Sequence, residues 1–115
     1  MAYDPMLAER IRRILRRRSN ILELKMFGGI GFLLAGNMCV AVWKDSLIAR
    51  LGRDAAPAAL EEESVVEFDV TGTPMRGWVM IEADGLESDR KLAEWIDRAT
   101  DFVATLPKKA PKGSK

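Results

Sequence analysis

The chain has 115 residues, 48% hydrophobic and 30% charged, a composition typical of one globular domain and too apolar for a disordered chain. Its single cysteine, Cys39, excludes an internal disulfide, and the lack of histidine removes the commonest metal ligand and the commonest general base near neutral pH. The net charge of +1 combines two basic ends, residues 1–18 and 108–115 at +4 each, with an acidic middle of −7. Such a bipolar chain favours self-association or an anionic partner.

Targeting signals are not visible in the sequence. No apolar run approaches the ~18–20 residues that a membrane span needs, and residues 1–5 lack the charged and apolar regions of a secretory signal. We therefore expect a cytoplasmic protein that does not associate with a membrane.

The first predicted element is an amphipathic helix. Asp4 is typical of an N-cap and Pro5 of a first helical position. The apolar residues recur at helical spacing on one face: Leu7, Ile11, Ile14 and Leu15. Five arginines lie on the other face: Arg10, Arg12, Arg13, Arg16 and Arg17. Ser19-Asn20 is expected to end the helix.

A meander of four antiparallel strands should follow. The strand-like runs are residues 21–27, 30–35, 38–43 and 46–51. Gly28-Gly29, Gly36-Asn37 and Lys44-Asp45 separate them, and glycine and asparagine tolerate the positive φ of tight hairpin turns. The run 38–43 is apolar on both faces, which predicts cover on both sides by helices or by a partner subunit, so a homodimer is plausible. Within it, Cys39 is expected to be a buried, unreactive hydrophobe.

The second half adds a short helix, two strands and a long helix. Asp54 should cap a helix over residues 55–62, and residues 65–70 and 77–82 read as strands. Ser88 opens the long helix, which reaches about Leu106 and has one apolar sector: Leu92, Trp95, Ile96, Ala99, Phe102, Val103 and Leu106. The predicted class is α+β, an antiparallel sheet of about six strands in the order α-β-β-β-β-α-β-β-α. It occupies residues 1–107, and residues 108–115 form a flexible basic tail.

Two turns are candidate interaction or ligand sites. The first comprises Lys25, Met26, Phe27, Gly28 and Gly29, and matches no phosphate-loop pattern. Hairpin geometry explains its glycines, and close approach of a ligand or docking partner is the alternative. The second comprises Met75, Arg76, Gly77 and Trp78. Tryptophan and arginine are frequent at binding hot spots, although Trp78 could equally be the first inward residue of its strand.

Chemistry elsewhere in the chain is sparse. Arg12, Arg13, Arg16 and Arg17 could contact nucleic-acid phosphates, the alternative being a solvated helix face. The carboxylates form no pattern typical of acid–base catalysis or of an EF-hand. We therefore expect no catalytic residues, no metal and no cofactor.

Four sequence blocks resemble the N-terminal domain of the TfoX (Sxy) competence-regulator family, over about Tyr3 to Leu106. They are residues 25–32 (KMFGGIGF), 36–39 (GNMC), 51–52 (LG) and 74–79 (PMRGWV). The resemblance implies an antiparallel sheet flanked by helices, in proteins that promote expression of DNA-uptake genes together with the cyclic-AMP receptor protein. It supplies no catalytic residue.

Three functions are compatible with these observations. The leading hypothesis is a non-enzymatic regulatory or interaction module, an accessory of transcription or competence that contacts a protein partner. The alternative is a small-molecule-binding domain or an enzyme, with a pocket at the Gly28-Gly29 and Arg76-Trp78 turns. The third is weak nucleic-acid binding through the arginine-rich first helix.

Overall fold

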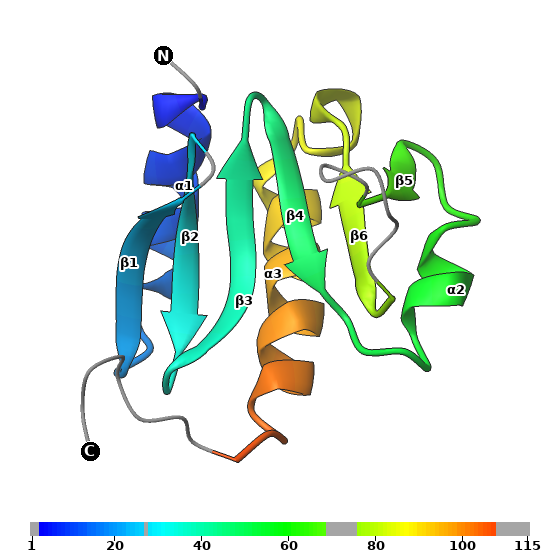
Figure 1. The fold of residues 1–115 in the computed structure, drawn as a ribbon. Coiled ribbons are helices and arrows are strands. Elements are labelled where there is room, and N and C mark those ends of the chain that lie inside the picture. Colours follow the sequence, from blue (N-terminus) through cyan, green and yellow to red (C-terminus); the bar gives the residue numbers. More distant parts are fainter. Residues whose placement is uncertain (1–2, 27, 69–75, 108–115) are drawn as a thin grey trace.

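Short apolar strands joined by tight turns pair with their neighbours in the chain, and the result is one antiparallel sheet backed by two long helices (Figure 1). The computed structural model describes residues 3–26, 28–68 and 76–107. Its elements are α1 (Pro5–Leu15), β1 (Ile21–Met26), β2 (Gly29–Leu34), β3 (Asn37–Trp43), β4 (Ser46–Arg50), α2 (Ala56–Ala59), β5 (Val65–Glu67), β6 (Trp78–Ile81), the 3₁₀ turn η1 (Ala83–Gly85) and α3 (Asp89–Val103). The predicted α+β class and element order are confirmed.

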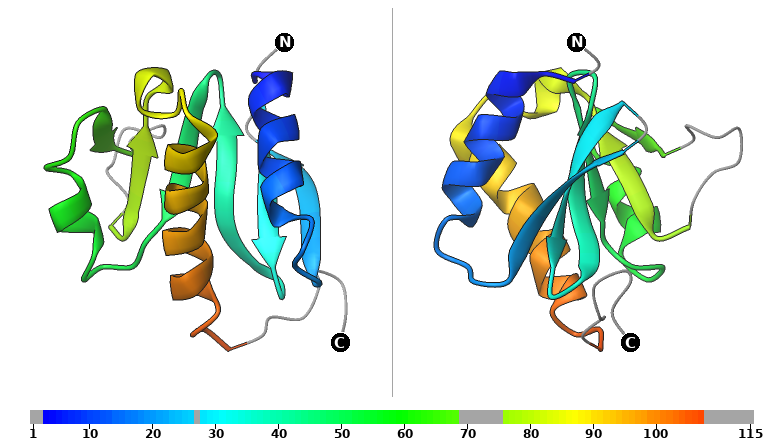
Figure 2. Two further views of the ribbon diagram at one scale, coloured as in Figure 1. Left: turned by 180° about the vertical axis from the view of Figure 1, so that it is seen from behind. Right: turned by 60° about the vertical axis from the view of Figure 1, so that its left-hand side comes forward.

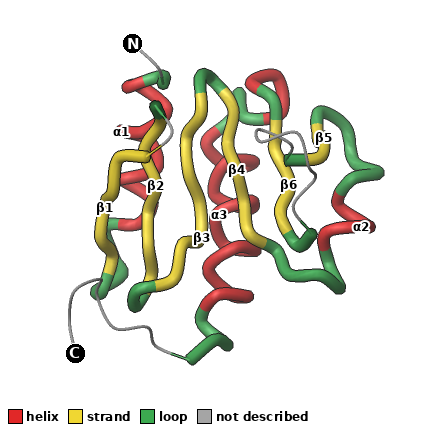
Figure 3. The backbone as a smooth tube through the Cα atoms, in the orientation of Figure 1, coloured by secondary structure: helices red, strands yellow, loops and turns green. Residues whose placement is uncertain are grey.

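The strand order in the sheet is β1-β2-β3-β4-β6-β5. The first four strands form the predicted meander, and β6 then pairs with β4 while β5 takes the edge (Figure 3). Both α1 and α3 lie on the same face of the sheet (Figure 2). None of the described helices is both long and apolar enough to cross a membrane.

Both long helices begin at the predicted caps. The Asp4 carboxylate accepts hydrogen bonds from the backbone N–H groups of Met6, at 2.9 Å, and Leu7, at 3.4 Å, and Pro5 is the first helical residue. The Ser88 hydroxyl accepts one from the N–H of Lys91 at 3.0 Å. These side chains satisfy N–H groups that have no partner within the helix.

Several predicted boundaries are wrong. The second turn is Ala35–Gly36, with φ of 52° and 87°, and Asn37 belongs to β3. Gly29 likewise opens β2, and only Gly28 of the predicted glycine pair lies in the turn, with φ of 77°. A tight hairpin turn needs left-handed backbone at its central residues, and register rather than composition decides which residues those are.

The predicted helices and strands of the second half are shorter in the structure. Helix α2 covers four residues, and its N-cap is Ala55 rather than Asp54. Strand β5 ends at Glu67, Phe68 lies beyond it, and residues 69–70 of the predicted strand lie outside the described residues. Helix α3 ends at Val103, and single turns continue to Leu106.

The core lies between the sheet and the two long helices. It contains the predicted faces of α1 and α3, with Ile14, Phe102 and Leu106 only partly buried at its margin. The register shifts between Phe32 and Leu33, which leaves Cys39 as the extra, bulged residue of β3. The Cys39 thiol is fully buried and donates to the carbonyl of Phe32 at 3.3 Å. Burial raises its pKa to about 11, so the thiol is protonated near neutral pH, as an unreactive core residue should be.

The opposite sheet face is open in the described part of the chain. Helical cover on both sides of β3, one of the two predicted explanations of its apolar run, is therefore wrong, because α1 and α3 share one face. The bulge explains part of the run, since Cys39 and Val40 both join the core. Leu22, Leu24 and Val66 are the large apolar residues that remain exposed on the open face, at 58%, 46% and 36%. A partner subunit at β3 stays a prediction.

Candidate functional site

Two loops meet at the end of the sheet where β4 stops and β6 starts. The carbonyl of Gly77 accepts hydrogen bonds from the N–H groups of Leu51, at 2.8 Å, and Gly52, at 3.0 Å. Both glycines have left-handed backbone, with φ of +90° at Gly52 and +88° at Gly77. Few other residues adopt this conformation without strain, so the junction depends on glycine at both positions.

Space at this junction is as restricted as its backbone. A Cβ added to Gly52 would lie 2.6 Å from Cε1 of Phe102, on α3, and one added to Gly77 would lie 3.3 Å from the carbonyl carbon of Gly52. The junction therefore packs tightly on α3. It holds the side chains before and after each glycine in set positions.

Three arginines line a hollow beside this junction together with Trp78. A hollow of about 640 Å³ is lined by Arg50, Arg53, Arg76, Trp78 and Phe102, together with Asp54 and Ala55. A smaller hollow of about 330 Å³ adds Pro57, Leu60 and Glu67. We call the region bounded by Arg50, Arg53, Arg76 and Trp78 the arginine cleft. Its lining combines one indole ring with three guanidinium groups and the carboxylate of Asp54.

Trp78 faces the open side of the sheet. It pairs in register with Arg50, whereas its neighbour Val79 pairs with Ala49 in the core. The guanidinium carbon of Arg50 lies 5.4 Å from the Trp78 ring centroid, and the Phe68 ring lies 6.0 Å away. The hypothesis that Trp78 is an inward core residue is therefore wrong. The ring is half-buried and presents one side to the cleft.

The arginine cleft differs from its surroundings in how its arginines are paired. Among the described residues no ion pair involves Arg50, Arg53 or Arg76. Arg50 makes one long contact, 3.5 Å from Nη1 to the carbonyl of Met38. By contrast, Arg98 at the neighbouring hollow binds Glu62 at 2.9 Å. The cleft therefore favours an anionic group.

The structure does not bring the two predicted turns together. Gly29 opens β2 beside the end of β3, and the register places that end of the sheet level with Ile81, whereas Trp78 lies at the other end of β6. Two strands, β3 and β4, also separate β2 from β6. The expectation of one pocket at both turns is wrong, and the cleft belongs to the later turn alone.

The remaining predicted residues of the two turns lie in different parts of the structure. Lys25 is exposed on β1, and Met26 ends that strand. Arg76 and Gly77 lie at the cleft. Phe27 and Met75 lie outside the described residues.

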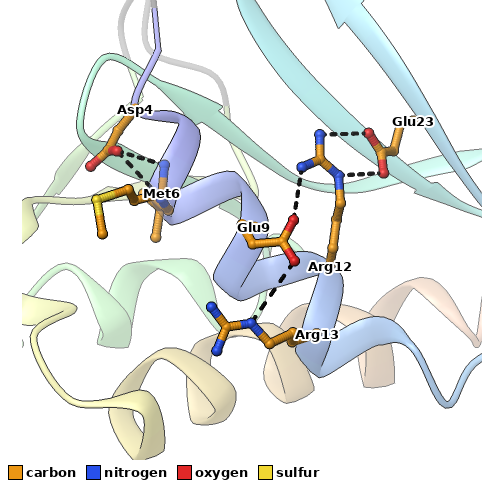
Figure 4. A network of polar contacts seen from close by, with 7 residues as sticks. Asp4, Met6, Glu9, Arg12, Arg13 and Glu23 are labelled. Atoms are coloured by element: carbon orange, nitrogen blue, oxygen red, sulfur yellow. Dashed lines mark hydrogen bonds and ion pairs between the residues drawn. The ribbon is translucent and has the colours of Figure 1, made fainter.

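The predicted nucleic-acid arginines of α1 divide into separate groups. Arg12 turns toward β1 and makes two hydrogen bonds with Glu23, of 2.7 and 3.0 Å, which raise its pKa (Figure 4). Arg13 lies on the side of Glu9 away from Arg12, with Nε 3.9 Å from the carboxylate. Arg12 is therefore committed within the chain, whereas Arg16, the exposed C-cap of α1, makes no ion pair among the described residues.

A different set of arginines lines a groove of about 510 Å³ between α1 and α3, which we call the helix groove: Arg10, Arg13, Arg17 and Arg18. Arg10 is tied to Asp89 at 3.0 Å and to the carbonyl of Leu86 at 2.8 Å. Asp97 also lines the groove and moderates its charge. The spacing of residues 10, 13 and 17, one stripe of the predicted helix, could have identified three of these four arginines from the sequence.

Sequence reasoning also missed Arg50 and Arg53. They flank Leu51-Gly52, one of the blocks that carry the family resemblance. That block was the signal in the sequence that could have identified them. Their neighbour Trp78 lies 28 residues beyond Arg50 and reaches it through the pairing of β4 with β6. Within the described residues, no group of three or more Cys, Asp or Glu side chains is placed to hold a metal ion.

Fold and site together describe a small α+β domain with a cationic cleft beside a tryptophan. The family model of the TfoX N-terminal domain matches residues 13–103. The chain therefore belongs to the TfoX N-terminal domain family, as the resemblance implied. No curated protein and no solved structure matches it.

Proposed function

We propose that this chain is a non-enzymatic regulatory module whose arginine cleft binds an acidic segment of a protein partner. The observation that carries the proposal is the hollow that three arginines share with a half-buried tryptophan, with no carboxylate paired to any of them in the described residues. Tryptophan and arginine are the residue types that dominate binding hot spots. An acidic segment would supply the missing charge, and its apolar side chains would cover the indole ring.

Reversing two charges of the arginine cleft should abolish most of this binding. The variant carries Arg53→Glu and Arg76→Glu, and the control carries Arg16→Glu and Arg90→Glu, an equal charge change on exposed residues remote from the cleft. The probe is a fluorescein-labelled, glutamate-rich peptide of about ten residues, measured by fluorescence anisotropy at low salt. We expect the cleft variant to bind at least about tenfold more weakly than the control.

Equal weakening by both variants would contradict the proposal, because the peptide would then sense only net charge. The small-molecule alternative predicts a different result. Native mass spectrometry of freshly purified protein would reveal a retained ligand, and an added mass that the cleft variant loses would favour a small-molecule site there.

The regulatory part of the proposal rests on family membership. Members are expected to promote expression of DNA-uptake genes, so the partner we propose is a component of the transcription machinery. A role of this kind places the protein in the compartment that holds the DNA, which we propose is the cytoplasm.

Nucleic-acid binding is the second candidate, and the helix groove favours it. Arg17 and Arg18 line the groove, and none of the ion pairs in the described residues involves them. Phosphates spaced along a duplex could contact the groove from α1 to α3. The acidic middle of the chain opposes this reading through its repulsion of a polyanion.

Charge reversal at Arg13 and Arg17 tests this second candidate. A labelled duplex of about 20 base pairs should bind the Arg13→Glu, Arg17→Glu variant at least about tenfold more weakly, with a shallower salt dependence. The Arg53→Glu, Arg76→Glu variant is the control, because it makes the same change in charge at the arginine cleft and leaves the helix groove unchanged. If the unmodified protein binds no duplex at about 50 mM salt, the candidate is wrong.

A further inference from the structure

Strand β1 is the edge of the sheet opposite β5, and its outer side has no strand partner among the described residues (Figure 1). The pairing of β1 with β2 determines which residues of β1 direct their backbone groups outward. The N–H of Ala35 donates to the carbonyl of Asn20 at 3.0 Å, and pairing alternates along the strand, so residues 20, 22, 24 and 26 bond toward β2. Ile21, Glu23 and Lys25 therefore direct their backbone N–H and C=O groups outward.

The side chains of the same strand divide between the two sheet faces. Leu22 and Leu24 lie on the open face and are the two most exposed large apolar residues of the described sheet. Glu23 and Lys25 lie on the helix face, in register with the core residues Phe32 and Ile30. An unpaired edge with exposed leucines is a template for another strand.

Charge favours one register for a second copy of the same edge, because only one position of the axis pairs Glu23 with Lys25. Pairing about a two-fold axis must place outward-bonding residues opposite each other. The axis therefore lies between one residue and the same residue of the second copy. An axis at Glu23 would place two glutamates opposite each other, and an axis at Lys25 two lysines. An axis at Leu24 places Glu23 of each copy opposite Lys25 of the other, which gives two complementary pairs.

We propose that two copies of this chain pair their β1 edges antiparallel about a two-fold axis at Leu24. The two six-stranded sheets then join into one continuous sheet. Glu23 and Lys25 of opposite copies exchange their outward backbone hydrogen bonds, and their side chains form ion pairs that extend the existing Arg12–Glu23 contact. Leu24 packs on its own copy across the axis, which explains the exposed leucine.

The dimer would place its two arginine clefts toward opposite ends of the joined sheet. Each cleft lies at β4 and β6, on the far side of β2 and β3 from the β1 edge. Two clefts on one particle can engage two segments of a partner at once, which raises avidity without new contacts. The dimer itself rests on β1 alone and does not depend on the proposed function.

Complementary charge variants test the register. Lys25→Glu alone places glutamate opposite glutamate, and Glu23→Lys alone places lysine opposite lysine. In sedimentation velocity each variant should raise the dimer dissociation constant by about tenfold or more over the unmodified chain. An equal mixture of the two should restore the dimer as a heterodimer, because both glutamates of the Lys25→Glu copy then face lysines of the Glu23→Lys copy. The mixture would not recover the dimer if each variant only destabilised the fold.

Cysteine crosslinking is a second test that does not involve Glu23, whose change also removes its ion pair with Arg12. A non-hydrogen-bonded antiparallel pair brings Cα atoms to about 4.5 Å, within the range for a disulfide. Leu24→Cys should therefore oxidise to a covalent dimer. Leu22→Cys is the matched control, since Leu22 lies on the same face and is more exposed, but the two copies of it would lie about 13 Å apart. Cys39 is buried and does not compete.

A covalent dimer with Leu24→Cys but not with Leu22→Cys, together with recovery of the dimer in the charge-variant mixture, is the expected result. Equal crosslinking of the two cysteine variants would overturn the register. A monomer at all concentrations up to about 100 µM for the unmodified chain, with no crosslink at residue 24, would overturn the dimer.

Discussion

Replacing Trp95 by alanine is expected to lower the free energy of unfolding by about 3–5 kcal/mol. The side chain is only 7% exposed and lies on the inner face of α3, against the core formed with the sheet. The Arg98 guanidinium also lies over the ring, at 4.3 Å from its centroid, and that contact would be lost as well. Because the domain is small, such a loss is a large part of its total stability.

Chemical denaturation followed by circular dichroism measures this change. Trp43→Ala is the matched control, because the same residue type there is half-buried outside the core cluster and lies beside Lys44. We expect the control to cost less than half as much. Equal losses for both variants, or an unchanged midpoint for Trp95→Ala, would contradict the assignment of α3 to the core.

Gly52→Ala should produce the second large effect, a loss of about 2–4 kcal/mol in the free energy of unfolding. Two causes combine at this position. The backbone has φ of +90°, and the added Cβ would lie 2.6 Å from the Phe102 ring. Relief of either strain would move the loop that carries Arg53, so affinity of the arginine cleft for its acidic peptide should fall as well.

A double-mutant comparison separates the two causes. Phe102→Ala removes the ring that the new methyl group meets, so Gly52→Ala should cost less in that background than in the unmodified chain. The loss of stability that remains would measure the strain of a non-glycine residue in the left-handed backbone at position 52. If Gly52→Ala costs the same in both backgrounds, the close approach to Phe102 contributes nothing.

Much of the fold could be predicted because its signals are local. Asp4 with Pro5, and Ser88, mark helix starts through hydrogen bonds made within three residues. The spacing of apolar residues likewise identified the buried faces of α1 and α3, because burial on a helix follows its own periodicity. Boundaries were less accurate at the hairpins, where Gly29 and Asn37 prove to be strand residues. Register, a property of two strands together, decides those positions.

The candidate site was predicted only in part, and for a related reason. The Arg76-Gly77-Trp78 segment was recognised, but its proposed companion at Gly28-Gly29 lies at the other end of the sheet. Its actual companions, Arg50 and Arg53, come from the end of β4 and the loop that follows it, through the insertion of β6 between β4 and β5. Nothing in the spacing along the chain encodes that insertion.

The same division applies to the arginines of α1. Their spacing in the sequence established that they form a basic helix surface, because the faces of a helix follow from its own periodicity. Tertiary structure decided that Arg12 binds Glu23 while Arg13 and Arg17 border the helix groove. By itself, then, the sequence determined the α+β class, the helix starts and most of the core, all of which depend on neighbours in the chain. Which charges remain free to bind a partner depended on the packing of distant segments, and only the tertiary structure could decide it.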